Sequence, residues 1–520
     1  MSVGRSGSTP LEIREKSQLP QPDAASPVPA TSPSGWWEQV FSFPAVLAAS
    51  LTYLVFVFSR RNIADPDLWW HLRNAQSLLT SGHFPVLDSY SYTAPGATFL
   101  PFEWLAELAY YAAYQWAGLS AMFLLVFVLC TAIALGVFRL SYLASHDVKN
   151  SFVVAVGGAV LAAISIGART LLFGWLYLVL LLLILEAARR GGWKWLWLVP
   201  PLFCLWVNTH GSWPMGMVVF AIFIASGLVQ GRWGHAYATR WSAAQLRKLL
   251  ITAGASAMAV FVNPCGYRLV FYPFEVMFGT YASIGHQDGK IEEFASIDFH
   301  TPWGKVAMVL ILGTLLISVF SRERWRLDEV AITMLALWYS LTYIRFLFLA
   351  GILLPPIFAK RVKLMSPYDR NSDKRRNNAV ALAILLCLFI ASVPRHSRFQ
   401  NPGRYPVGAV AYMKTNGIHG RVFHEYVWGG YLIWHMPELK VFIDGRLDPY
   451  THNGVFEDYM AAVSGESPQA VLDKYQVEYV LMPPDSRLSK FLKSSPTWTQ
   501  LYSDETSVLL HRSPTSRPSP

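Results

Sequence analysis

Acidic, imidazole and guanidinium side chains gather in one short stretch, ADPDLWWHLRNAQSLLTSG, at residues 64–82. Asp65 and Asp67 supply two carboxylates, and His71 and Arg73 follow within two helical turns. Because side chains four residues apart share one face of a helix, we expect Asp67 and His71 to lie together. A carboxylate beside an imidazole suits general acid–base chemistry or metal binding, and a guanidinium suits anionic groups.

The same stretch carries the signals that begin and end a helix. Asp65 precedes Pro66, and proline is favoured at the first helical position, so Asp65 is the predicted N-cap. Gly82 is the predicted C-terminal stop. A purely structural alternative stays open, in which Asp65 only caps the helix and Asp67 only complements its dipole.

The composition excludes most soluble classes. The chain has 520 residues, of which 53% are hydrophobic and 15% are charged, and its mean hydropathy is +0.31. These values are typical of a polytopic membrane protein. The formal net charge of +10 falls mostly in short loops between apolar segments, so it indicates membrane topology and not a nucleic-acid partner.

Apolar runs divide the chain. They predict about eleven transmembrane helices, several of them short for a bilayer, at residues 43–59, 119–143, 152–168, 171–188, 195–207, 214–229, 249–262, 306–320, 330–343, 346–358 and 379–393. The predicted fold class is therefore a mainly α polytopic membrane protein with a small α/β outer domain. The predicted parts are a disordered cytoplasmic tail at 1–40, a transmembrane domain at 41–394 with large outer loops at 60–120 and 263–303, and an outer domain at 395–520.

Basic residues predict the orientation of these segments. If the N-terminus is cytoplasmic, clusters such as Arg189, Arg190 and Lys194 all fall in inner loops, as the positive-inside rule requires. The C-terminal domain then lies on the periplasmic or extracellular side of the inner (plasma) membrane. Its segments GRVFHEYVW, KVFIDGR, VEYVLM and SVLLHR predict strands. Within the loop at 60–120, FEWLAELAYYAAYQWAG predicts an amphipathic helix at the membrane surface or leading into the second span.

The segment DPDLWWHLRNAQSLLTSGHFPVLDSYSYTAP, placed between the first span and a second acidic helix, resembles the first outer loop of the C-class (GT-C) membrane glycosyltransferases. That superfamily includes the oligosaccharyltransferase catalytic subunit, protein mannosyltransferases and aminoarabinose transferases. Its members carry an acidic motif in this loop and use sugars linked to lipid phosphates. The resemblance covers the many-span plan, the first loop and the outer C-terminal domain.

A second tract, EYVWGGYLIW followed by VFIDGR, resembles the Trp-Trp-Asp-Tyr-Gly region with which oligosaccharyltransferases grip the acceptor sequon. Here Gly429 and Gly430 follow Trp428, so the aspartate of that motif is absent. The departure puts transfer to a peptide sequon in doubt. In the structural alternative, the aromatic residues of the tract belong to the domain core and Asp444 with Arg446 forms an ion pair.

The resemblance implies transfer of a sugar from a polyprenyl-phosphate donor to a glycan, lipid or protein acceptor at the outer face, with inversion by direct displacement. Asp65 and Asp67 are the expected catalytic carboxylates. The expected ligands of the donor phosphate, which snorkelling or capping could also explain, are His71, Arg73, Arg169, His210, Arg268 and Arg345. The expected substrate or acceptor contacts are Trp69, Trp70, Glu103, Trp428, Tyr431, Asp444 and Arg446. For Trp69 and Trp70, anchoring at the membrane interface is the alternative.

A divalent cation is a further expectation. Some family members place a second acidic contact in the other large outer loop, and Glu292 lies there in IEEFASIDF. Asp67 and Glu292 could share Mg²⁺ or Mn²⁺, which prefer oxygen ligands; a solvated acidic loop is the alternative. Two other functions stay open: a transporter or flippase for a lipid-linked saccharide, and a non-catalytic membrane assembly subunit.

Overall fold

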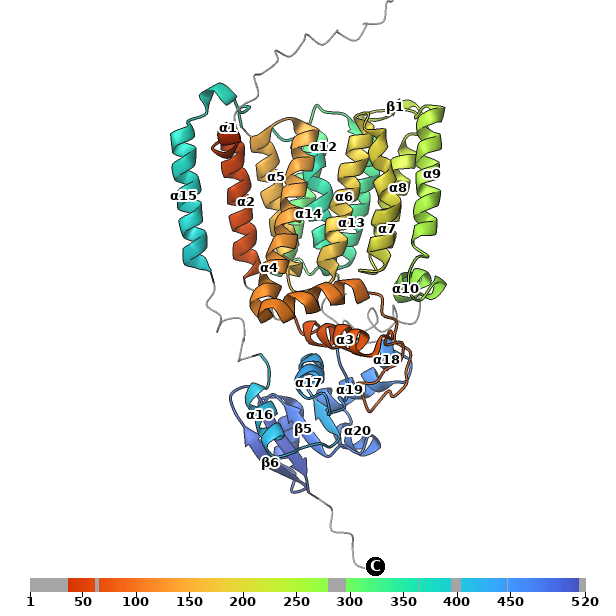
Figure 1. The fold of residues 1–520 in the computed structure, drawn as a ribbon, viewed down its shortest axis with the longest axis vertical. Coiled ribbons are helices and arrows are strands. Elements are labelled where there is room, and N and C mark those ends of the chain that lie inside the picture. The colour runs from red at the N-terminus through yellow and green to blue at the C-terminus, as the bar shows by residue number, and fades with distance from the viewer. Residues whose placement is uncertain are drawn as a thin grey trace, which may run out of the picture.

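The computed structural model describes residues 36–60, 65–278, 296–363, 365–393, 404–446 and 448–513. It is mainly helical, with small sheets, and its C-terminal part lies beyond one end of a helical bundle (Figure 1). Among the described residues, five helices are long and apolar enough to cross a membrane, and shorter apolar helices pack beside them. The predicted mainly α class is therefore confirmed, and these five helices are the candidate membrane spans of the described part of the chain. Most of the predicted tail at 1–40 lies outside the described residues, as does Glu292.

The bundle consists of α2 (Phe43–Ser59), α4 (Trp104–Ser145), α5 (Val148–Ala162), α6 (Leu171–Arg189), α7 (Val199–Val207), α8 (Trp213–Ser226), α9 (Ala243–Ala259), α12 (Pro302–Phe320), α13 (Leu327–Thr342), α14 (Leu347–Ala359) and α15 (Arg375–Ser392). Helix α14 lies at its centre and is apolar on all sides, as a helix surrounded by other helices must be. Gly158 of α5 and Gly351 of α14 let these two helices approach closely, since a Cβ on either would collide with the backbone oxygen of the other. Helix α15 packs along α2 and is otherwise almost fully exposed.

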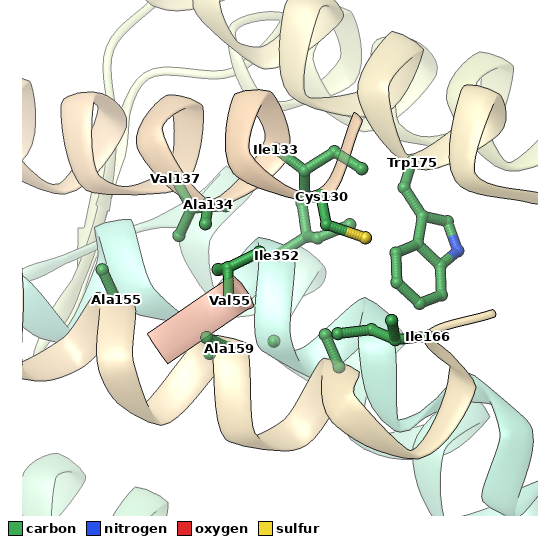
Figure 2. A pocket seen from close by; sticks show the side chains of 13 residues that line it. Val55, Cys130, Ile133, Ala134, Val137, Ala155, Ala159, Ile166, Trp175 and Ile352 are labelled. Atoms are coloured by element: carbon green, nitrogen blue, oxygen red, sulfur yellow. The ribbon is translucent and has the colours of Figure 1, made fainter. Parts of the chain in front are cut away.

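One small cavity lies inside the bundle, between α2, α4, α5, α6 and α14 (Figure 2). Its volume is about 30 Å³, and its lining is apolar, with Val55, Cys130 and Ile352 among its residues. An apolar cavity of this size stays dry and is too small for a sugar or a lipid chain. The candidate chemistry therefore has to lie elsewhere.

Helix α3 (Leu68–Ser81) lies across the end of the bundle, between the spanning helices and the C-terminal domain (Figure 1). The regular helix begins later than predicted: Asp67 occupies its N-cap without a capping bond. Asp65 instead caps the preceding turn, because its Oδ1 accepts a hydrogen bond from the Asp67 N–H at 3.0 Å. The predicted stop at Gly82 is confirmed, with φ of +69°.

Helix α4 combines the predicted amphipathic helix with the second apolar run. The two parts meet at a kink where Ala117 and Gly118 leave helical geometry, and Gly118 has φ of +59°. The first part lies across the bundle end beside α3, and the second part runs through the bundle (Figure 1). This arrangement brings the acidic start of α4 to α3.

The C-terminal domain is built on a four-stranded mixed sheet in the order β4-β5-β7-β6. β4 and β5 are parallel, and the other two pairs are antiparallel. Its elements are α16 (Val407–Thr415), β4 (Val422–His424), α17 (Gly429–His435), α18 (Asp448–Thr451), α19 (Val455–Ser464), α20 (Pro468–Lys474), β5 (Tyr479–Met482), α21 (Arg487–Lys493), β6 (Trp498–Ser503) and β7 (Val508–Arg512). The sequence pattern missed β6.

The predicted strand at KVFIDGR is wrong, because it is not part of this sheet. The backbone of Val441 pairs with the first outer loop instead: its N–H donates to Tyr90 O at 2.9 Å, and its carbonyl accepts from Tyr92 N at 3.1 Å. Thr93 Oγ1 also donates to Phe442 O at 2.5 Å. The first loop and the C-terminal domain are therefore joined through backbone hydrogen bonds.

Candidate functional site

Asp65 pairs with a cation from the bundle. Its Oδ2 lies 2.5 Å from Nε of Arg169, which stands between α5 and α6. The Asp65 side chain is 6% exposed, whereas that of Arg169 is 31% exposed. Tyr110 of α4 donates a hydrogen bond to the backbone oxygen of Arg169 at 2.5 Å. Asp65 therefore holds the guanidinium of Arg169, which is still partly exposed, while Tyr110 fixes the backbone of the same residue.

Asp67 lies beside this pair in a polar but confined position. Trp70 Nε1 donates to its Oδ1 at 3.0 Å. A Cβ added at Gly445 of the C-terminal domain would overlap the same oxygen. Burial, followed by the charge of Asp65, raises the pKa of Asp67 to about 7, although His71, Trp70 and Arg169 act in the opposite direction. Asp67 is therefore able to gain or lose a proton near neutral pH.

His71 lies between two glutamates at the start of α4. Its Nδ1 is 3.0 Å from Glu107 Oε1, and its Nε2 is 3.6 Å from Glu103 Oε2. Burial alone lowers the pKa of His71, but the hydrogen bond to Glu107 and the nearby carboxylates raise it overall. Asn74 also donates to Glu107 Oε1, at 2.9 Å. The predicted phosphate ligand His71 thus makes its hydrogen bond to Glu107 inside the protein.

Glu103 connects α4 to the α5–α6 and α7–α8 connections. Thr170 Oγ1 donates to its Oε1 at 2.6 Å, and His210 Nε2 lies 3.5 Å from the same oxygen. Burial is the main cause that raises the pKa of Glu103 to about 7. Burial and then the charge of Arg345 lower the pKa of His210 to about 3. His210 Nδ1 accepts from Ser212 N at 3.0 Å, so neutral His210 carries its proton on Nε2, toward Glu103.

The other cations predicted to bind phosphate differ in their contacts. Arg345 lies in η4 (Ile344–Phe346), where its backbone oxygen accepts a hydrogen bond from Ser165 Oγ at 3.2 Å, and its charge helps to lower the pKa of His210. Arg73 bonds Gln76 at 2.6 Å on α3. Arg268 is exposed at the start of α10 (Tyr267–Phe278). No hydrogen bond or ion pair within the described ranges joins Arg73 or Arg268 to the two aspartates.

The expected divalent metal ion, Mg²⁺ or Mn²⁺, stays a prediction. No group of three or more His, Cys, Asp or Glu side chains in the described part of the chain is arranged to hold a metal ion. The proposed partner of Asp67, Glu292, lies outside that part.

The aromatic candidates lie in a packed interface between α3 and the C-terminal domain. Trp69 meets Tyr431 edge to face with ring centroids 5.5 Å apart, and Tyr431 stacks on Tyr405 at 4.8 Å. Trp428 is buried, and its Nε1 donates to Arg404 O at 2.9 Å. Trp69 and Tyr431 therefore help to join the domain to the first loop, whereas Trp428 makes its hydrogen bond within the C-terminal part of the chain.

Glycines of the two C-terminal motifs allow this close approach. A Cβ at Gly430 would lie 2.7 Å from the backbone oxygen of Pro66, and one at Gly429 would collide with Ile443 O. Gly445 of IDGR faces Asp67 in the same way. The WGGY and IDGR motifs therefore meet the DPD turn directly. Gly429 and Gly430 stand where the resembling motif has its aspartate. A side chain at either position would collide with a backbone oxygen.

Asp444 and Arg446 form a buried network with the first loop. Arg446 Nη2 lies 2.6 Å from Asp88 and 2.7 Å from Asp444, and Tyr450 donates to Asp444 at 2.5 Å. The Arg446 and Asp88 side chains are 1% and 0% exposed. Sequence reasoning missed Asp88, although an aspartate that opens the turn DSYS is a signal for a fixed loop. It also missed Thr170, which directly follows Arg169.

Comparisons with known proteins concern the fold alone. No protein-family model matches the chain, and no curated protein matches its sequence. The structure is similar to the apo oligosaccharyltransferase of Archaeoglobus fulgidus, with a TM-score of 0.50, 12% identity, and coverage of 86% of this chain and 70% of that chain. The same enzyme tethered to an acceptor peptide containing the NVT sequon gives a TM-score of 0.50 at 13% identity, covering 86% of this chain and 69% of that one.

A third similar structure is the mycobacterial arabinofuranosyltransferase AftD, with a TM-score of 0.45 and 12% identity, covering 93% of this chain and 42% of that chain. The resemblance to C-class membrane glycosyltransferases is therefore confirmed at the level of the fold, on the two oligosaccharyltransferase structures.

Proposed function

We propose that the chain is an integral membrane glycosyltransferase that moves a sugar from a polyprenyl-phosphate donor to an acceptor hydroxyl. The observation that carries the proposal is the Asp65–Arg169 pair immediately beside Asp67. A carboxylate with a raised pKa next to a partly exposed guanidinium provides a base and a phosphate ligand in one place. The fold shared with the oligosaccharyltransferase supports the same assignment.

Each residue has a distinct part in the proposed reaction. Asp65 orients Arg169 by holding its Nε, and Arg169 binds the donor phosphate, with the charge of Arg345 nearby. Asp67 takes the proton of the acceptor hydroxyl. The acceptor oxygen then forms a bond to the anomeric carbon as the carbon–oxygen bond to phosphate breaks, and polyprenyl phosphate leaves with the electron pair. The anomeric configuration inverts.

The proposal includes a topology. Each of the eleven apolar runs coincides with a helix of the bundle, and we propose that all eleven cross the membrane. Five of them meet the length and composition of a span on their own. With a cytoplasmic N-terminus, an odd number of crossings puts the C-terminal domain and the candidate site on the outer side.

The direct test uses the purified full-length chain with a panel of polyprenyl-phosphate-linked sugars carrying a labelled sugar. We expect at least one donor to release polyprenyl phosphate at a rate above the protein-free control. Release should increase when a membrane-extract acceptor fraction is added. If every donor stays intact while a labelled lipid-linked saccharide crosses reconstituted vesicles, the chain is a flippase and the proposal is wrong.

Gly445→Ala is expected to reduce transfer by about 100-fold, because the new Cβ displaces the Asp67 carboxylate and misplacement of about 1 Å costs this much. Initial rates of donor cleavage measure the effect. Gly313→Ala is the matched control, since its Cβ meets no atom within 4 Å. Equal rates in the two variants would contradict the placement of Asp67 by Gly445.

The rate is expected to rise about tenfold between pH 6 and pH 8. The pKa of Asp67 is about 7, and only its deprotonated form accepts a proton, so the active fraction grows as pH passes upward through 7. Glu103 titrates in the same window. A Glu103→Gln variant separates the two, because its pH profile should keep the same inflection. A flat profile in the wild-type protein would exclude Asp67 as the base.

A further inference from the structure

A basic surface lies at the end of the bundle opposite the C-terminal domain. It is formed by the connection η2 (Trp193–Leu198), the hairpin of β1 (Gly231–Trp233) and β2 (Ala236–Ala238), and the start of α9 (Figure 1). Its exposed cations are Lys194, Arg232, Arg240, Arg247 and Lys248, which we call the basic end patch. The sequence contains no Asp or Glu between Glu186 and Glu275, so this part of the chain has no acidic residue of its own to neutralise these charges.

Other cations at the same end of the bundle, Arg189 and Arg361, form ion pairs. Arg189 pairs with Asp328 at 2.7 Å, and Arg361 pairs with Glu329 at 2.5 Å while lying 3.8 Å from the Trp325 ring. These pairs hold α6, α13 and α14 together. By contrast, none of the five cations of the basic end patch forms an ion pair with any described residue. Their charge is therefore available to a partner.

Exposed tryptophans lie on the same segments as the cations of the basic end patch. Trp197 is 62% exposed, Trp233 is 53% exposed and Trp195 is 47% exposed. Lys194 lies 5.3 Å from the centre of the Trp195 ring. Tryptophan is favoured at the depth of lipid headgroups, where its ring is partly apolar and its N–H finds polar partners. The exposed rings therefore favour lipid headgroups over a soluble partner at this end of the bundle.

The elements that carry the patch are fixed to the bundle. β2 pairs in parallel with β3 (Trp325–Arg326), which leads into α13. Trp241 closes the other side: its N–H donates to Gly227 O at 2.7 Å, and its Nε1 donates to Ile224 O at 3.1 Å. Its ring also meets Trp193 edge to face, with centroids 6.0 Å apart. The cations are thus presented on short, anchored segments.

We propose that the basic end patch binds the headgroups of anionic phospholipids in the leaflet that surrounds it. The patch lies where the spanning helices leave the bilayer, so headgroups are already present at its surface. Lys and Arg next to an anionic leaflet each strengthen binding by roughly five-fold, and the tryptophan rings set their depth. This inference does not depend on the proposed sugar transfer.

Native mass spectrometry of the full-length protein, titrated with phosphatidylglycerol or phosphatidylcholine, tests the inference. We expect the wild-type protein to prefer phosphatidylglycerol. The variant Arg232→Gln/Arg240→Gln/Lys248→Gln should bind phosphatidylglycerol at least about 10-fold more weakly and phosphatidylcholine unchanged. The matched control, Lys414→Gln/Lys490→Gln/Lys493→Gln, removes the same charge from exposed positions of the C-terminal domain and should behave as wild type.

Two results would overturn the inference. Equal losses in both triple variants would show that total charge, and not the patch, governs lipid binding. Displacement of phosphatidylglycerol by soluble poly-glutamate at matched charge concentration would make an acidic protein the partner. The melting temperature of each variant in detergent shows that it is folded, since all six positions are exposed.

Discussion

Asp67→Asn is expected to lower the rate of sugar transfer by about 10²- to 10⁴-fold, the usual contribution of a general base. The amide keeps the shape of the side chain and can still accept the hydrogen bond from Trp70 Nε1, so the site geometry should survive. What is lost is the ability to accept a proton from the acceptor hydroxyl. Steady-state kinetics with the active donor, comparing kcat with KM, measure the effect. We expect kcat to fall while KM for the donor changes little.

The matched control for this experiment is Asp298→Asn. That carboxylate is exposed and interacts with His300 at 3.0 Å, far in sequence from the DPD turn. Its removal should leave transfer unchanged. Wild-type turnover by Asp67→Asn would show that Asp67 is only a structural residue at the start of α3, and the base would have to be sought elsewhere.

Arg446→Met is expected to destabilise the protein by about 3 to 5 kcal/mol, the usual cost of breaking a buried ion pair. The substitution leaves the carboxylates of Asp88 and Asp444 close together without a cation. Because Asp88 belongs to the first loop and Asp444 to the C-terminal domain, the junction between the two should open. Thermal unfolding in detergent, followed by limited proteolysis of the first loop, measures both effects.

Arg512→Met is the matched control. Arg512 pairs with Asp473 at the surface, and such pairs contribute at most about 1 kcal/mol. If Arg446→Met unfolds at the wild-type temperature and only raises KM for a substrate, the predicted substrate contact is correct. If it lowers the unfolding temperature strongly, Arg446 has the structural role that the ion-pair alternative describes.

Local patterns were sufficient to predict the apolar helices of the bundle and the approximate place of α3. The apolar run at 171–188 falls on α6, and the Asp65–Gly82 signals bracket α3, because hydrophobic period and capping residues act over a few positions. The strand predicted at KVFIDGR failed for a physical reason. Alternation shows that a segment is half-buried and extended, but not which backbone it pairs with, and Val441 pairs with Tyr90 instead of a sheet neighbour.

The site could be predicted only in part. Arg169 and Arg268 are both cations at the ends of apolar segments, but of these two Arg169 alone reaches Asp65. Nothing local distinguishes them, since the direction in which each side chain points depends on how its helix is rotated in the bundle. The position of His71 between Glu103 and Glu107 likewise depends on the kink at Gly118 that turns the start of α4 across the bundle.

The hydrogen bonds between the first loop and the C-terminal domain set the timing of assembly. Thr93 and Phe442 are 349 positions apart. At common rates of protein synthesis, roughly 20 to 70 s separate the emergence of these two segments from the ribosome. During this interval the spanning helices can insert, but the DPD turn has no cover. A newly made chain therefore completes this junction only after Phe442 has been synthesised, and a chain stopped before Val441 lacks the Val441, Phe442 and Gly445 contacts with the first loop.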